Sequence, residues 1–158
     1  FLGQSRYGQS AILFTGGNTD CHIILRGGRQ TVNYDAASVD ETCRLLAPTG
    51  LPARVMIDCS HANSGKDPAR QPGVCRDVAA QIAAGARRII GVMLESHLMA
   101  GAQKLVPGRA LVYGQSITDG CIGWDETYTL FSELAQSVRT GRAPSNAPGQ
   151  PVAVADPA

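Results

Sequence analysis

One repeated pattern restricts the fold of this chain more than any other feature: a short apolar run that ends in a polar or charged residue. The central copy is Val55–Asp58, followed by the polar segment Cys59–Ser64. Similar runs lie at Cys21–Arg26 and Ile89–Glu95, and a weaker copy lies at Ser116–Asp119. A continuous apolar run bounded by turn residues is typical of a strand buried on both faces, although periodicity alone does not exclude a buried helix. We therefore expect a parallel sheet.

Apolar positions at helical spacing predict three helices between and after these runs. The first begins at the N-cap residue Asp35 and stops before Pro48. The second has Pro72 in its first turn and ends at Gly85, and the third runs from about Asp125 to Arg139. Strands that alternate with helices imply right-handed crossovers, so the predicted class is α/β.

Three segments lie outside this alternation. Residues Phe1–Thr15 contain two β-type runs around a polar, glycine-containing stretch, which predicts a β-hairpin. Residues between Glu95 and Ser116 are predicted to form a long loop with room for a short hairpin. Residues 143–158 contain four prolines and many small residues, so we expect a disordered tail after a folded region of residues 1–142.

Composition excludes several classes of partner. The net charge is +1, with acidic and basic residues interspersed, so the chain lacks the basic surface typical of proteins that bind nucleic acid or anionic membranes. No apolar run approaches the ~18 residues of a membrane span. The five cysteines are odd in number and lack CxxC spacing, which favours a reducing, cytoplasmic location. The chain begins at Phe1 within patterned sequence, and we expect it to be a fragment.

Four polar residues occupy equivalent places in successive units. Arg26, His61, Glu95 and Asp119 each lie at or just past the C-terminal end of a different predicted strand. TIM barrels carry their catalytic groups at this end, and open doubly wound sheets also bind ligands there. The placement therefore leaves both architectures open, but it predicts that the four side chains converge on one site.

The chemistry of these residues suits a metal and an anion. One imidazole and two carboxylates can bind Mn²⁺, Fe²⁺, Co²⁺ or Zn²⁺, and the set does not choose among them. Arg26 is followed by Gly27 and Gly28, so its guanidinium can form two parallel bonds to a phosphate or carboxylate with little bulk nearby. Other roles are open for each residue alone: a loop anchor for His61, helix caps for the two acids, and a surface ion pair for the arginine.

The same segments resemble a known family. In order, they are Asp20–Gly28, Asp58–Ser64, Ile90–His97 and Tyr113–Asp119. Together they look like the C-terminal half of a class I 3-deoxy-D-arabino-heptulosonate 7-phosphate (DAHP) synthase. The likeness runs from Phe1 to about Arg142, and four ordered motifs are far more specific than any one of them.

The resemblance implies a fold, a reaction and roles for the site residues. The fold would be a (β/α)₈ barrel that condenses phosphoenolpyruvate with erythrose 4-phosphate and water, releasing phosphate, at the entry to the shikimate pathway. Carried onto matching positions, His61, Glu95 and Asp119 would be metal ligands, with the metal a Lewis acid toward the aldehyde. Arg26 would bind phosphoenolpyruvate, and His61 would also assist proton transfer.

The resemblance also implies what this chain lacks. The family's remaining metal ligand, a cysteine, and several cationic substrate-binding residues belong to an N-terminal half that this sequence does not contain. A whole barrel takes ~250 residues, whereas about four strand–helix units are present here, so the isolated chain should be a poor enzyme. The family further implies a homo-oligomer and an aromatic amino acid inhibitor site near Phe1–Leu13. Two alternatives stay open: a related phosphoenolpyruvate-condensing synthase, such as the 3-deoxy-octulosonate 8-phosphate group, and a non-catalytic ligand-binding fragment.

Overall fold

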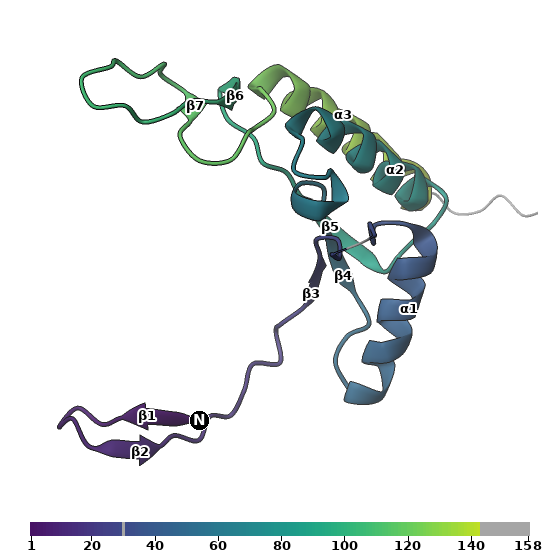
Figure 1. The fold of residues 1–158 in the computed structure, drawn as a ribbon. Helices are drawn as coiled ribbons and strands as arrows, with labels where there is room; N and C mark the ends of the chain where they lie inside the picture. The colour runs from purple at the N-terminus through teal and green to yellow at the C-terminus, as the bar shows by residue number, and fades with distance from the viewer. Residues whose placement is uncertain (30, 143–158) are drawn as a thin grey trace, which may run out of the picture.

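A three-stranded parallel sheet lies at the centre of the computed structural model, which describes residues 1–29 and 31–142 (Figure 1). Its strands, in spatial order, are β3 (Ile23–Leu25), β4 (Val55–Asp58) and β5 (Ile89–Met93). Ile23 pairs with Val55, and Val55 pairs with Ile89. The predicted α/β class and these three strands are confirmed, and their C-terminal ends share one edge of the sheet.

The three predicted helices are present. α1 (Ala36–Leu46) begins after Asp35, whose carboxylate accepts a 3.0 Å hydrogen bond from the Ser38 amide as an N-cap. α2 (Gln71–Ala83) has its proline in the first turn, where no amide donor is needed. α3 (Trp124–Arg142) extends beyond both predicted ends and lies alongside α2 (Figure 1). Three short 3₁₀ helices, η1 (Ala47–Thr49), η2 (His61–Asn63) and η3 (Pro68–Arg70), lie in the connections.

Two apolar clusters hold these layers together. In the first, Val39 and Cys43 of α1 and Val78 of α2 pack with Val55 and Ile57 of the central strand. Both of these β4 residues are fully buried, and burial of such a side chain contributes about 1.5–3 kcal/mol. The second cluster joins α2 and α3 beyond the end of β4 and contains Cys59, Val74, Cys75, Ile122 and Leu130. Because β4 contacts both neighbouring strands and its residues enter the first cluster, its end is a firm support for a site.

The predicted N-terminal hairpin is confirmed. β1 (Leu2–Gln4) and β2 (Ser10–Ile12) pair in antiparallel fashion, with Leu2 opposite Ile12. Figure 1 shows this hairpin extending away from the central sheet. Leu2 is 81% exposed and Phe14 is 93% exposed, so the hairpin presents apolar surface.

The prediction for the region after Glu95 was wrong in two respects. Residues 103–114 form a long loop as expected, but in place of a short hairpin the region also contains β6 (Met99–Ala102), which pairs in parallel with β7 (Gln115–Ser116). β7 therefore belongs to a separate two-stranded sheet and does not join the central one. The reason is that Ile122 already occupies the position beside the chain that follows β5: its amide donates to the Glu95 carbonyl at 2.9 Å, and its carbonyl accepts from the His97 amide at 3.0 Å.

Other expectations concern cysteines, membranes and the tail. All five cysteines are free thiols, and Cys43, Cys59 and Cys75 are buried. Among the described residues, no helix has the length and apolar character needed to span a bilayer. The predicted disordered tail, residues 143–158, lies outside the described residues.

Candidate metal centre

Three of the four predicted site residues come together at the C-terminal edge of the sheet. His61 follows β4, Glu95 follows β5 and Asp119 follows β7. One ligand atom from each lies within 4.8 Å of the other two, and His61 Nε2 is 3.5 Å from Glu95 Oε1. The first two side chains are half-buried and Asp119 is exposed, so the cluster has one side open to solvent. One nitrogen and two carboxylate oxygens can bind a divalent first-row metal.

The His61 ring is held by a buried carboxylate that the sequence reasoning did not identify. Asp58, the last residue of β4, is only 1% exposed, and its Oδ2 lies 2.7 Å from His61 Nδ1. The other oxygen, Oδ1, accepts from the Ser60 amide at 2.8 Å and from the Ser60 hydroxyl at 2.5 Å. A carboxylate beside Nδ1 favours a proton on that nitrogen, which leaves the Nε2 lone pair facing the cluster.

The backbone at His61 is also specialised. His61 has φ of 46°, in the left-handed region that few non-glycine residues adopt. Its carbonyl accepts a 2.6 Å hydrogen bond from the Lys66 amide, which closes the turn after β4. Unusual backbone of this kind is often found where a side chain must be directed into a functional site. At His61, the left-handed backbone occurs in the same residue whose imidazole contacts Asp58.

Glu95 is fixed through its main chain. The amide of Glu95 donates to Gln71 Oε1 at 2.8 Å, and its carbonyl accepts from Gln71 Nε2 at 3.3 Å. Gln71 is 1% exposed and was also missed from the sequence. A glutamine before a proline carries no local sign of a contact 24 residues away. Asp58 could have been suspected, because an acidic residue at the end of a buried strand needs a polar partner.

Arg26 lies on the neighbouring strand end, outside the cluster of ligand atoms. It follows β3, its side chain is exposed, and its guanidinium forms no ion pair with the described residues. Its carbonyl accepts from the Ala62 amide at 3.2 Å, which joins this strand end to the His61 turn. Gly27 has φ of 84°, and a Cβ there would lie 2.7 Å from the Asn63 amide nitrogen. Only glycine allows the two segments to approach this closely.

A pair of asparagines reinforces that junction. Buried Asn63 donates through Nδ2 to the carbonyls of Leu25 at 3.1 Å and Asp58 at 2.8 Å. Its Oδ1 accepts from the Asn33 amide at 2.9 Å, and Asn33 in turn accepts from the Gly27 amide at 2.7 Å. These bonds connect the ends of β3 and β4, and so they fix Arg26 relative to His61 at the level of the backbone.

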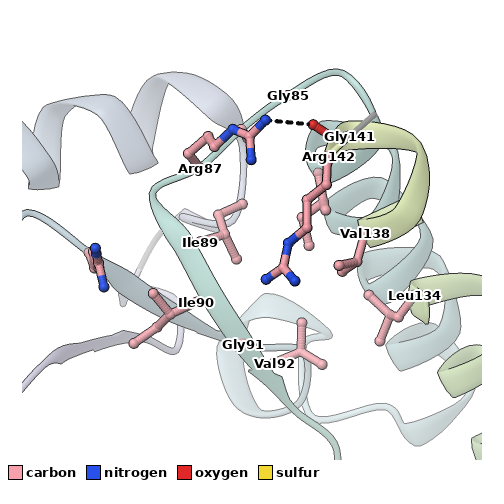
Figure 2. Close-up of a pocket in the computed structure, with 13 residues that line it drawn as sticks. Gly85, Arg87, Ile89, Ile90, Gly91, Val92, Leu134, Val138, Gly141 and Arg142 are labelled. Carbon is pink, nitrogen blue, oxygen red and sulfur yellow. Dashed lines mark hydrogen bonds between the residues drawn. The ribbon is translucent and has the colours of Figure 1, made fainter. Parts of the chain in front are cut away.

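A hollow of about 430 Å³ lies elsewhere, between β5, α2 and α3 (Figure 2). Its wall combines apolar side chains with Arg54, Arg87 and Arg142, and Figure 2 shows the Arg142 side chain extending into it. At its rim, Arg87 donates to the Gly141 carbonyl at 3.0 Å. None of its lining residues belongs to the metal cluster. It runs along β5 from Ile89 to Val92 and includes no residue of the cluster, so the hollow and the cluster are separate features.

Comparison with known proteins agrees with this arrangement. The family model described as the DAHP synthetase I family matches residues 3–132. This chain belongs to that family. It is 54% identical over 142 residues to the Phe-sensitive phospho-2-dehydro-3-deoxyheptonate aldolase of Escherichia coli K12, covering 90% of this chain and 40% of the relative. The corresponding aldolase of Haemophilus influenzae is 51% identical over 138 residues, covering 87% of this chain and 38% of the relative.

A solved structure of the family supports the fold. The phospho-2-dehydro-3-deoxyheptonate aldolase of Francisella tularensis SCHU S4 superposes with a TM-score of 0.80 at 41% sequence identity. The match covers 90% of this chain and 41% of that one. The chain thus spans about two-fifths of the length of the DAHP synthetase I relatives it matches.

Proposed function

We propose that this chain is the metal-binding C-terminal part of a DAHP synthase. The complete enzyme condenses phosphoenolpyruvate with erythrose 4-phosphate and water to give DAHP and phosphate. The observation that carries the proposal is the cluster of His61, Glu95 and Asp119, which follow β4, β5 and β7, in a chain of the DAHP synthetase I family. Family membership alone would not assign the residues, and the cluster alone would not name the reaction.

The same proposal includes the fold of the complete enzyme. Residues 1–142 form the C-terminal half of a (β/α)₈ barrel, in which β3, β4 and β5 are three adjacent strands of the barrel wall. Support comes from the parallel pairing of these strands in chain order and from the polar residues at their shared C-terminal edge. The match to about two-fifths of a solved family member is consistent with a partial barrel.

The proposed metal is Mn²⁺, Fe²⁺, Co²⁺ or Zn²⁺, held by His61 Nε2 and by carboxylate oxygens of Glu95 and Asp119. The residues present fit such an ion, because Asp58 directs the Nε2 lone pair toward the two acids. Three protein donors leave coordination positions for a further ligand and for substrate. When bound, the ion supplies Lewis acidity toward a carbonyl oxygen. His61 lies where it can also assist the movement of a proton.

Arg26 is proposed to bind phosphoenolpyruvate. Its guanidinium is exposed and free of carboxylate partners among the described residues, at the strand end next to His61. A planar guanidinium can form two parallel hydrogen bonds to a carboxylate or phosphate, which a lysine ammonium cannot reproduce. The Gly27 contact with the His61 turn fixes the backbone from which this side chain extends.

The N-terminal hairpin is proposed to form contacts in the assembled enzyme. Leu2 and Phe14 expose most of their apolar surface, and such surface usually marks an interaction site. We propose that the hairpin contacts other subunits of a homo-oligomer and helps to form an inhibitor site for an aromatic amino acid. One relative carries the name Phe-sensitive, which supports an aromatic inhibitor.

A chimaera tests the proposed reaction. It joins the part of the Escherichia coli relative that this chain does not match to residues 1–142 of this chain. We expect the chimaera with Mn²⁺ to release phosphate and form DAHP from the two substrates, and the 158-residue chain alone to form none. A chimaera carrying His61→Ala is the matched control and should be inactive.

Three outcomes would contradict the proposal. A chimaera that folds and binds both substrates without turnover would favour a non-catalytic ligand-binding role. A chimaera that prefers arabinose 5-phosphate to erythrose 4-phosphate would favour a related phosphoenolpyruvate-condensing synthase. Full activity of the His61→Ala chimaera would remove His61 from the site.

A further inference from the structure

Gln71 is a buried amide at the start of α2 with its polar atoms directed at one residue. It is 1% exposed, and burial of a side-chain amide is costly unless both its donor and its acceptor are bonded. Both are bonded here, and both partners belong to the backbone of Glu95. The Gln71 side chain therefore makes the two hydrogen bonds to Glu95 that the backbone of a neighbouring strand would make if Glu95 were still part of the sheet.

Apart from Gln71, few hydrogen bonds hold the main chain at Glu95. β5 ends at Met93, so the main chain at Glu95 no longer pairs with β4. The Ile122 amide donates to the Glu95 carbonyl at 2.9 Å, but the Glu95 amide donates to Gln71 Oε1. Removal of the Gln71 amide would leave that N–H without the partner that the structure gives it.

Because of its position in the chain, Gln71 connects the two segments that carry His61 and Glu95. Gln71 begins the helix that follows the turn carrying His61, whereas Glu95 lies beyond the next strand. The hydrogen-bonded amide therefore links the segment that supplies the imidazole to the segment that supplies a carboxylate. It holds the Glu95 backbone in the place from which Oε1 reaches within 3.5 Å of His61 Nε2.

We propose that Gln71 is a positioning residue for the metal centre, acting through the Glu95 main chain and not as a ligand. This inference rests on the proposed metal-binding role of His61, Glu95 and Asp119. Partners that orient a ligand typically change metal affinity by about 10- to 100-fold when they are removed. A residue that only filled space in the core would instead change stability without a selective effect on the ion.

The test compares two glutamines of the same helix. Gln71→Met keeps most of the side-chain volume and removes both hydrogen bonds to Glu95. Gln81→Met is the matched control, because Gln81 Nε2 donates to the Tyr34 carbonyl at 2.8 Å and to Asp77 at 2.7 Å, with no contact to a cluster residue. Mn²⁺ affinity of the 158-residue chain is measured by calorimetry, and folding is measured by thermal melting without metal.

We expect the Mn²⁺ dissociation constant to rise about 10-fold or more in Gln71→Met and to stay unchanged in Gln81→Met. The visible absorption band of bound Co²⁺, which reports ligand geometry, should shift only in the Gln71 variant. Unchanged affinity and spectrum in a folded Gln71→Met chain would overturn the inference while leaving the proposed metal site intact. Unfolding of Gln71→Met but not of Gln81→Met would also overturn it, since the role would then be structural. Absence of Mn²⁺ binding by the wild-type chain would overturn the inference, because three side chains would then not suffice for the site on which it rests, whereas the chimaera tests the proposed reaction separately.

Discussion

Asp58 is the residue on which the orientation of the His61 imidazole depends. Its carboxylate lies 2.7 Å from Nδ1 and is held in turn by the amide and hydroxyl of Ser60. A ring fixed on one nitrogen can offer the other to a metal without losing rotational freedom at binding. We therefore expect the buried acid to strengthen metal binding at the proposed site, although it lies outside the cluster of His61, Glu95 and Asp119.

Replacement of Asp58 tests this contribution. Asp58→Asn keeps the shape of the side chain but removes the carboxylate, so we expect the Mn²⁺ dissociation constant to rise by about 10- to 100-fold. Asp67→Asn is the control, because Asp67 accepts from the Ala69 amide at 2.9 Å in the adjacent connection and has no contact with His61. Calorimetry on the two variants gives the comparison. Equal affinities would mean that the ring keeps its orientation without the carboxylate.

At the scale of single residues, the sequence predicted that the residues of the cluster would come together, but it did not predict the residues that hold them in place. His61, Glu95 and Asp119 were found because each follows an apolar run, and the ends of parallel strands share one edge. Gln71 could not be found in this way. Its contact with Glu95 depends on how α2 packs against the chain that follows β5, and this packing is not encoded near position 71 or 95.

Among the secondary-structure elements, α1 has the most local explanation. Asp35 accepts from the Ser38 amide at 3.0 Å and from the Ser38 hydroxyl at 2.7 Å. These bonds to Ser38 lower the pKa of Asp35, because they favour the charged carboxylate. A lowered folded-state pKa means that the cap is fully stabilising above the ordinary pKa of 3.8 and weakens as pH falls through the lower, folded-state value.

Removal of this cap should therefore have a pH-dependent effect. We expect Asp35→Ala to lower the free energy of unfolding by about 1 kcal/mol at pH 7 and by less in strong acid. Asp40→Ala, on the same helix, removes an exposed ion pair with Arg88 and should change stability by no more than about 1 kcal/mol. Urea unfolding at several pH values measures both variants. A constant loss across the whole acid range would show that the Asp35 charge does not strengthen the cap.

Helices were predicted better than short strands for a physical reason. α1, α2 and α3 follow from apolar spacing within each segment, helped by the Asp35 cap of α1 and the first-turn proline of α2, and a sequence displays these signals directly. β6 and β7 are four and two residues long, and each exists only because it pairs with the other. Ile122 pairs with the main chain at Glu95, and this pairing depends on how residues 95–122 pack together.

The whole molecule is consistent with one part of a larger assembly. The chain spans about 40% of the length of its Escherichia coli relative, and its central sheet has only three strands, with β3 and β5 at the edges. The hollow beside β5 and the exposed hairpin residues are surfaces that we expect the rest of the enzyme to cover (Figures 1 and 2). Local patterns predicted the units of this fold, whereas closure of the proposed barrel would depend on strands outside the central sheet.

The central claim is that this part of the enzyme carries a metal site of three side chains. Mn²⁺ titration of the 158-residue chain by calorimetry tests it most directly, with His61→Ala, Glu95→Gln and Asp119→Asn as variants and Asp20→Asn as an exposed control. We expect one site in the wild-type chain, a dissociation constant raised about 10-fold or more in each ligand variant, and no change in the control. Unchanged stoichiometry and affinity in folded His61→Ala would contradict the account.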